Sequence, residues 1–419
     1  MSIGTGLVAV GVDAGPYQII AGKAPGIAVM GDTVEVVSTA GILTSGPNKD
    51  PNTLGVGILG AYGIFATSVG GSVTVRSTGN IATTGNDATG IMAAGLGGDA
   101  IVSSTGNIST EGKNALGLYA LSAGGAASVT STGNITTQGG QAIGIAVNAD
   151  GNASAISTGN ITTSGNTATG IYVNSLAGTA TVISTGDIFT TGNGAKGIDA
   201  VACSCSGDAA SVVSTGNVRT EGKNAIGISA DANIGQASVT SVGNIVTTGL
   251  GSDGILAKSQ SSGATVASTG NVTTGSDNAV GLHAVGGAGS ATVTSTGSIS
   301  TSGSASYGIF ARSNGGDATA VSNGSIQTTG DSATGIRVRA TGDATAVSNG
   351  SISVSGASAA GISARSTGGA VSITTTGDVI ASAADASAIR ANAATNAAVT
   401  INGGTVAGGS GLGAGVRFL

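Results

Sequence analysis

The chain has 419 residues, a formal net charge of −6 and only 8% charged residues. This acidic balance argues against binding to nucleic acid through overall charge, and we expect no specific nucleic-acid partner. The sequence contains no run of 18 apolar residues, so we expect no transmembrane helix. With 77 glycines, no tryptophan, four phenylalanines and five tyrosines, it is poorly suited to a globular core built on large side chains.

Residues 1–32 do not fit the repeat that fills the rest of the chain, and we expect an irregular N-terminal cap or edge coil there. The first 22 residues contain no lysine or arginine, so they lack the basic start of a secretory signal peptide. We therefore expect either a protein that is not exported or an internal segment of an exported one.

Residues 33–419 repeat one phrase, whose clearest copies read Ser-Thr-Gly-Asn-Ile, and we predict one continuous repeat domain. Nine of the twelve intervals between the anchor aliphatic residues are 27 residues long. Ile42 precedes this series by one 27-residue interval plus a 12-residue insertion near 46–57. A fixed period in this range indicates stacked supersecondary units. The anchors are Ile81, Ile108, Ile135, Ile161, Ile188, Val218, Ile245, Val272, Ile299, Ile326, Ile352, Val379 and Val406.

Each repeat predicts three short strands. Counted from the anchor as position zero, small apolar or hydroxyl residues recur at even positions: valine at −6, serine at −4, threonine at +2, isoleucine or leucine at +10, and alanine or valine at +12. This period of two is typical of strands, and the Gly-Asn pair before the anchor and the glycines at +4 and +9 supply the bends. Helical solenoids need stretches rich in Leu, Ala, Lys and Glu, whereas this repeat is rich in Ser, Thr and Gly, with Val and Ile.

We therefore predict an all-β fold, a single parallel β-solenoid of about 14 coils with three short strands per coil. Right-handedness follows from the usual preference of parallel crossovers. Because stacking places like residues above one another, we expect the asparagine, serine and threonine columns to form hydrogen-bonded ladders.

The one 30-residue interval predicts an extended loop near 202–207, which contains both cysteines of the chain, Cys203 and Cys205. These thiols could form a small strained disulfide, bind a metal weakly or stay reduced. A zinc site usually needs four ligands, and neither a histidine nor a second cysteine pair accompanies them. We interpret the loop as structural and predict no metal site.

Two outward columns, at positions +11 and +13, have an unusual composition. They contain six of the eight arginines of the chain, all in the last five coils, and several of its few aromatic residues. Rings could stack on sugars or apolar surface, and guanidinium groups bind phosphate, sulfate or carboxylate. The predicted binding residues are Arg312, Arg337, Arg339, Arg365, Arg390, Arg417, Phe65, Tyr119, Tyr172 and Phe310.

Other interpretations of these columns stay open. Strands favour aromatic residues in any case, and scattered charge keeps a protein soluble. The rings near the N-terminus could instead pack beneath the insertion. Stacked arginines repel one another, and Asp317 and Asp343 in the following turns are candidates to offset that repulsion.

An enzymatic site is not expected. The acidic residues are scattered along the chain, whereas polysaccharide-cleaving sites need clustered carboxylates, often with calcium or a basic residue. The only histidine, His283, has no evident partner in the sequence. We predict no catalytic residues and no cofactor.

The repeated boxes, each followed by Gly-Ile-x-Ala or Gly-Ile-x-Val, resemble repeats in the passenger domains of Gram-negative autotransporters and of haemagglutinin-like surface adhesins. The resemblance covers residues 33–416. It implies an extracellular or outer-membrane surface location and a longer parent protein, in which a signal sequence precedes the repeats and an outer-membrane barrel follows them.

The expected function is therefore non-catalytic: adhesion to acidic polysaccharide or another cell-surface glycan, or self-association in a biofilm. The first alternative is a passive stalk or filament subunit without a ligand site. The second alternative is a polysaccharide-processing β-helix enzyme.

Overall fold

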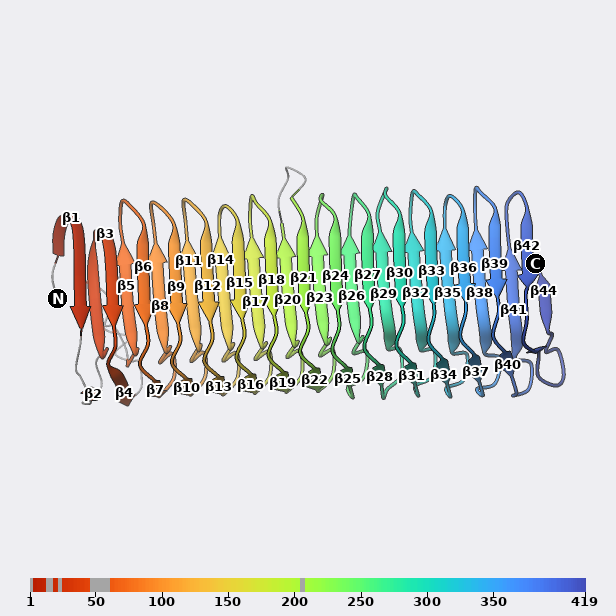
Figure 1. The fold of residues 1–419 in the computed structure, drawn as a ribbon, viewed down its shortest axis with the longest axis horizontal. Coiled ribbons are helices and arrows are strands. Elements are labelled where there is room, and N and C mark those ends of the chain that lie inside the picture. The colour runs from red at the N-terminus through yellow and green to blue at the C-terminus, as the bar shows by residue number, and fades with distance from the viewer. Residues whose placement is uncertain (1–2, 13–17, 22–24, 46–60, 204–207) are drawn as a thin grey trace. The chain divides into compact units, whose positions relative to one another are not determined.

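A computed structural model describes residues 3–12, 18–21, 25–45, 61–203 and 208–419 (Figure 1). It confirms the predicted fold class: a parallel β-solenoid of about 14 turns, with two parallel sheets and no helix among the described residues. The predicted insertion and positions 204–207 of the predicted loop lie outside the described residues. The handedness stays a prediction. By their contacts, residues 1–204 and 205–419 form two compact units, each described by itself below.

Two strands of each coil belong to the first sheet and the third strand belongs to the second sheet. In residues 1–204 the first sheet holds β1 (Ile3–Val12), β3 (Ile27–Ser38), β5 (Ile64–Ser68), β6 (Val73–Ser77), β8 (Ile91–Gly95), β9 (Ala100–Ser104), β11 (Leu118–Ser122), β12 (Ala127–Ser131), β14 (Ile145–Ala149), β15 (Ala153–Ser157), β17 (Ile171–Ser175), β18 (Ala180–Ser184) and β20 (Ile198–Ala202). The second sheet holds β2 (Gln18–Ala21), β4 (Gly41–Ser45), β7 (Ile81–Thr84), β10 (Ile108–Glu111), β13 (Ile135–Gln138), β16 (Ile161–Ser164) and β19 (Ile188–Thr191).

The unit of residues 205–419 repeats the same arrangement. Its first sheet holds β21 (Ala210–Ser214), β23 (Ile228–Ala232), β24 (Ala237–Ser241), β26 (Ile255–Ser259), β27 (Ala264–Ser268), β29 (Val280–Gly286), β30 (Ala291–Ser295), β32 (Tyr307–Ser313), β33 (Ala318–Ser322), β35 (Thr334–Ala340), β36 (Ala344–Ser348), β38 (Ala360–Ser366), β39 (Val371–Thr375), β41 (Ser387–Asn392), β42 (Ala397–Ile401) and β44 (Val416–Phe418). Its second sheet holds β22 (Val218–Glu221), β25 (Ile245–Thr247), β28 (Val272–Thr274), β31 (Ile299–Thr301), β34 (Ile326–Thr328), β37 (Ile352–Val354), β40 (Val379–Ala381) and β43 (Val406–Ala407).

The pairing register equals the sequence repeat. The anchor Ile108 on β10 lies beside the anchor Ile135 on β13, and Thr110 lies beside Thr137. Figure 1 shows strands of one type side by side in successive coils. Within residues 1–32, β1 pairs in parallel with β3, with one irregularity in register. Each column of the sequence is therefore a physical column of side chains at strand spacing, about 4.8 Å.

The even positions face the core, as predicted. The anchors from Ile81 to Val379 are fully buried, and so are the +2 threonines and the −4 serines, whereas the last anchor, Val406, is half-buried. The prediction that serine and threonine hydroxyl groups bond to one another along each column is wrong, however. Thr110 Oγ1 donates to the carbonyl of Ala115 in its own coil at 2.6 Å, and several −4 serines, Ser77 and Ser104 among them, have no partner among the described residues. The +2 threonines from Thr83 to Thr247 thus hold the turn that follows their strand rather than one another, whereas the hydroxyl groups of Thr274, Thr301 and Thr328 have no partner among the described residues.

The asparagine ladder exists, and it links a side chain to the backbone. The backbone nitrogen of Asn107 donates to Asn80 Oδ1 at 2.9 Å, and the backbone nitrogen of Asn134 donates to Asn107 Oδ1 at the same distance. The glycine before each asparagine is needed because the coils approach closely there. A Cβ atom on Gly106 would lie 2.1 Å from the carbonyl oxygen of Gly79.

We predict that Gly106→Ala lowers the free energy of unfolding by about 1 to 3 kcal/mol, because the new methyl group forces two stacked backbones apart. Gly124→Ala is the matched control, since a Cβ atom there meets its nearest neighbour at 3.4 Å, an ordinary contact. The measurement is the urea midpoint followed by circular dichroism. Equal midpoints for the two variants would contradict the close approach at this corner.

Candidate anion-binding surface

Three arginines at position +13 form a continuous column in the unit of residues 205–419. Arg312, Arg339 and Arg365 lie on β32, β35 and β38, which are consecutive strands of one sheet type. The register places Arg312 beside Arg339 and Arg339 beside Arg365. All three side chains are exposed, because the neighbouring even positions face the core. We call these residues the arginine column.

A shallow groove of about 270 Å³ runs beside the arginine column. The rest of its lining comes from the end of each strand and the turn that follows. Thr341 Oγ1 donates to the carbonyl of Asn314 at 2.7 Å, and Arg312 Nε donates to Asn314 Oδ1 at 3.0 Å, which orients the Arg312 guanidinium group. The groove is lined by Arg312, Ser313, Asn314, Arg339, Ala340, Thr341, Arg365 and Thr367.

The positive charge of the arginine column is not neutralised by an ion pair. The ion pairs seen among the described residues of this unit, Arg219 with Glu221, Lys258 with Asp231 and His283 with Asp253, do not involve the arginine column. Burial lowers the pKa of Arg339, and the charge of Arg337 lowers it further. Tyr307 opposes this shift, and Arg365 and Arg312 add smaller effects that lower the pKa. The column therefore carries uncompensated charge in a partly desolvated place.

The two aspartates in the following turns have a different role from the one predicted. Asp317 Oδ1 accepts a hydrogen bond from the Asp343 amide nitrogen at 2.8 Å, and Asp343 Oδ1 accepts one from the Ala370 amide nitrogen at 2.8 Å. Both carboxylates therefore satisfy the backbone of the next coil, as the asparagines do elsewhere. They form no ion pair with the arginine column.

The +11 position is less exposed than the sequence suggests. The Arg337 guanidinium carbon lies 4.7 Å from the centre of the Tyr307 ring and 5.5 Å from that of Phe310. The same guanidinium group also donates to the Tyr307 hydroxyl. His283 stacks on Phe310 with ring centres 5.0 Å apart. Two of the predicted binding residues, Phe310 and Arg337, thus make their contacts within the protein: the Phe310 ring with His283 and Arg337, and the Arg337 guanidinium group with Tyr307 and Phe310.

His283 does have a partner, contrary to expectation. Its Nδ1 lies 2.9 Å from Asp253 Oδ2, and Asp253 Oδ1 accepts a hydrogen bond from the Val280 amide nitrogen at 2.8 Å. Asp253 stands at position +8 of the preceding coil, 30 residues earlier. Tyr307 and Arg337 have the same separation. A search for complementary residues 30 apart, from +8 to the next +11, would have found both contacts.

The two remaining arginines among the predicted binding residues, Arg390 and Arg417, lie near the C-terminus of the chain. Arg390 donates to the carbonyls of Ser358 at 3.2 Å and Ala359 at 3.0 Å. Burial lowers the pKa of Arg390, and the charge of Arg417 adds to this effect. Arg417 on β44 is exposed and lies beside Arg390 in register. Arg390 therefore satisfies carbonyl groups of a neighbouring coil, and Arg390 and Arg417 stand at position +11, two residues before the position of the arginine column.

The aromatic residues of the other unit are spaced out along their column. Phe65, Tyr119 and Tyr172 are all half-buried at position +11. Met92 lies between Phe65 and Tyr119, and Ala146 lies between Tyr119 and Tyr172. The register thus does not place these three rings on adjacent strands.

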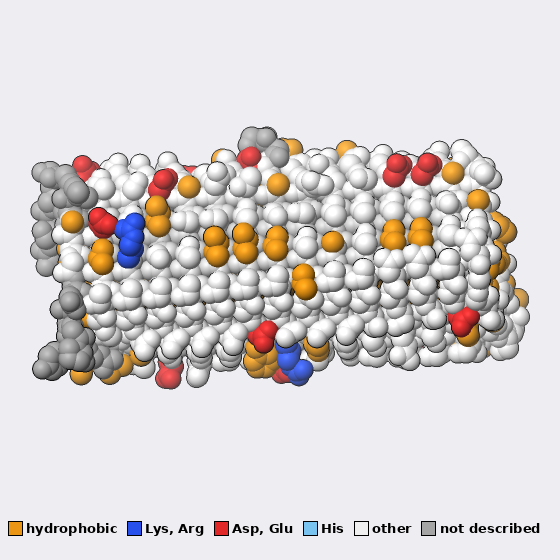
Figure 2. Space-filling model, viewed as in Figure 1, with side chains coloured by type: hydrophobic (Ala, Val, Ile, Leu, Met, Phe, Trp, Pro, Cys, Tyr) orange, Lys and Arg blue, Asp and Glu red, His pale blue; other side chains and the backbone are white. Residues whose placement is uncertain are grey.

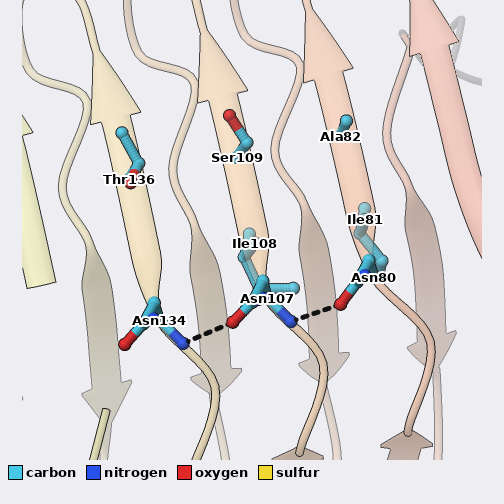
Figure 3. Close-up of a pocket in the computed structure, with 8 residues that line it drawn as sticks. All are labelled: Asn80, Ile81, Ala82, Asn107, Ile108, Ser109, Asn134 and Thr136. Atoms are coloured by element: carbon cyan, nitrogen blue, oxygen red, sulfur yellow. Dashed lines mark hydrogen bonds between the residues drawn. The ribbon is translucent and has the colours of Figure 1, made fainter. Parts of the chain in front are cut away.

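A second shallow groove, of about 360 Å³, follows the asparagine ladder in residues 1–204 (Figure 3). Its side-chain amides sit beside the small +1 residues of β7, β10 and β13, and the asparagine oxygens accept the ladder hydrogen bonds. The groove contains no charged or aromatic side chain, so we assign it a structural role. Its lining consists of Asn80, Ile81, Ala82, Asn107, Ile108, Ser109, Asn134 and Thr136.

Of the two cysteines, Cys203 is exposed with a free thiol, and its Sγ lies 3.5 Å from Asn174 Oδ1. Cys205 lies outside the described residues. The described ranges contain no group of three or more His, Cys, Asp or Glu side chains placed to hold a metal ion. A search of the same ranges finds no helix with the length and apolar character needed to span a membrane.

The pH dependence of stability tests whether Tyr172 is partly buried at position +11. Burial raises the pKa of Tyr172, and Asp199, Cys203 and Tyr119 raise it further. A raised phenol pKa contributes stability that is fully present below the unfolded value near 10 and is lost as pH rises through the folded value. We predict that Tyr172→Phe, which keeps the ring, loses less stability than the wild type between about pH 9 and pH 11. Urea midpoints measure this, and identical losses would show that the phenol is solvated.

The geometry described above stands without support from related proteins. Comparison with protein-family models, with curated proteins and with solved structures found no match for this chain.

Proposed function

We propose that the protein is a non-catalytic surface protein that uses the arginine column to adhere to acidic polysaccharide outside the cell. The observation that carries the proposal is the column itself: three exposed guanidinium groups, in register on consecutive strands, beside a groove and without an ion-pair partner among the described residues. Stacking like charges at strand spacing costs stability, and a bound polyanion would remove that cost.

Arginine suits this role because its planar fork matches carboxylate and sulfate groups, with two parallel hydrogen bonds to each. The acidic side chains nearest in sequence to the groove, Asp317 and Asp343, already accept backbone hydrogen bonds. We assign them no general acid or base role, and the proposal is for binding alone. The proposed location at the cell surface follows from the resemblance of the repeats to adhesin passengers.

A second candidate function is a passive stalk or filament subunit. The face drawn in Figure 2 favours it, because charged side chains are few and isolated there and most of the surface is neutral. On such a face the repeat offers regular columns of small residues and a row of separate exposed aliphatic side chains, without a concentration of charge. The stalk and the adhesin differ in whether the arginine column binds anything.

We predict that the double variant Arg339→Gln/Arg365→Gln binds dextran sulfate and polygalacturonate at least about tenfold more weakly than the wild type, since about 1.4 kcal/mol of lost contacts has that effect. Wild-type binding should weaken as salt is raised. Biolayer interferometry with the immobilised polysaccharides provides the measurement.

The matched control is the double variant Arg76→Gln/Lys113→Gln, which removes the same charge from the other unit. Arg76 pairs with Glu35 at 2.6 Å, and both control residues are exposed. An equal loss in this control would assign the binding to net charge rather than to the column. Absence of wild-type binding to both polysaccharides would favour the stalk.

A further inference from the structure

We infer that the ligand of the arginine column is a linear acidic polysaccharide that lies along the stacking direction of the coils, with successive acidic groups on Arg312, Arg339 and Arg365. This inference rests on the proposed function and deepens it, because it specifies the orientation, the charge spacing and the minimum length of the ligand. Four properties of the groove support it.

The first property is the direction of the column. The three arginines are paired across parallel strands, so the line that joins them runs perpendicular to the strands and along the stack. Their backbone spacing is the strand spacing, about 4.8 Å. A polymer with one carboxylate or sulfate group per sugar repeats its charge over the length of one sugar ring, which is of similar size. Such a chain can follow the column from coil to coil.

The second property is the polar lining that accompanies the arginines. The Thr341 hydroxyl donates to the Asn314 carbonyl at 2.7 Å, and the Thr367 hydroxyl lies 3.5 Å from the carbonyl of Ala340. Donation in this direction leaves the lone pairs of both oxygens available as acceptors. Sugar hydroxyl groups are suitable donors to them. The groove thus offers both cationic donors and acceptors for hydroxyl groups.

The third property disfavours nucleic acid. Phosphates of one DNA strand follow each other at about 3.4 Å along a duplex, which does not match the strand spacing. Single-stranded nucleic acid needs aromatic faces on which bases stack. Here Phe310 has His283 stacked at 5.0 Å and the Arg337 guanidinium carbon at 5.5 Å, and Tyr307 also lies under Arg337.

The fourth property is that the column has defined ends. Val285 is the in-register neighbour of Arg312 on one side, and Asn392 is that of Arg365 on the other. The column therefore accepts three consecutive acidic groups. An oligosaccharide with fewer charges cannot contact all three arginines. A longer one extends past Asn392 without a further cationic contact in this column, and past Val285 it meets Lys258, which is already paired with Asp231 at 3.6 Å.

The test extends the column by one residue. Asn392→Arg adds a fourth guanidinium group in register, and Gln327→Arg adds the same charge on an exposed position of β34 in the second sheet as the matched control. The probes are di-, tri- and hexagalacturonate, sulfated cello-oligosaccharides of the same lengths, and a single-stranded oligonucleotide. Far-UV circular dichroism and urea midpoints verify that both variants are folded. Isothermal titration calorimetry at several salt concentrations gives the affinities.

For the wild type we expect trisaccharide and hexasaccharide to bind with similar affinity and the disaccharide to bind several-fold more weakly. Asn392→Arg should tighten hexasaccharide binding at least threefold and make the slope of log affinity against log salt steeper by about one, while trisaccharide binding changes less than twofold. Gln327→Arg should change neither. Whether the carboxylated or the sulfated series responds identifies the acidic group.

Three outcomes would overturn the inference: an equal gain from Gln327→Arg, a gain from Asn392→Arg that does not depend on ligand length, or tighter binding of the oligonucleotide than of either sugar series. The failure of the proposed function looks different. If that function fails, the wild type binds neither polysaccharide series, and Arg339→Gln/Arg365→Gln changes nothing. If only the alignment fails, the double variant still loses binding and Asn392→Arg brings no length-dependent gain.

Discussion

The in-register stacking of parallel strands at one repeat per coil is the constraint on which the rest of this structure depends. Because Ile108 must lie beside Ile135 and Thr110 beside Thr137, every position of the repeat becomes a column of neighbours. Inside, this rule demands small residues of uniform size, since each must fit the copy above it. Outside, the same rule converts one substitution per repeat into a line of identical chemical groups, which is how three arginines come to share one surface.

The fold could be predicted from the sequence because inward positions are read directly from a period of two. The buried Ile, Thr and Ser columns are those that the spacing indicates. The hydroxyl partners could not be predicted in the same way. Whether Thr110 bonds to a neighbouring threonine or to the carbonyl of Ala115 depends on how the turn after the strand folds back, and the repeat does not encode that path in its periodicity.

The candidate site was predictable in part for the same reason. Position +13 faces outward by parity and is exposed, so Arg312, Arg339 and Arg365 are where the pattern places them. Position +11 has the same parity, but side chains from position +8 lie beside it and partly bury it, as Tyr307 does with Arg337. A period of two predicts which side of a strand a residue faces. It does not predict whether a side chain from another position, such as +8, covers that residue. Positions +11 and +13, which look alike in the sequence, therefore form two columns with different roles.

The asparagine ladder has a direction, and this has a consequence for how the chain acquires its structure. In residues 1–204 the side chain of Asn80 serves the backbone of Asn107, and that of Asn107 serves the backbone of Asn134. Each ordered coil thus presents a side-chain acceptor to the coil after it and a backbone donor to the coil before it. A coil that orders at either edge of the stack gains one ladder hydrogen bond, so the ladder favours growth of the solenoid coil by coil from an ordered edge.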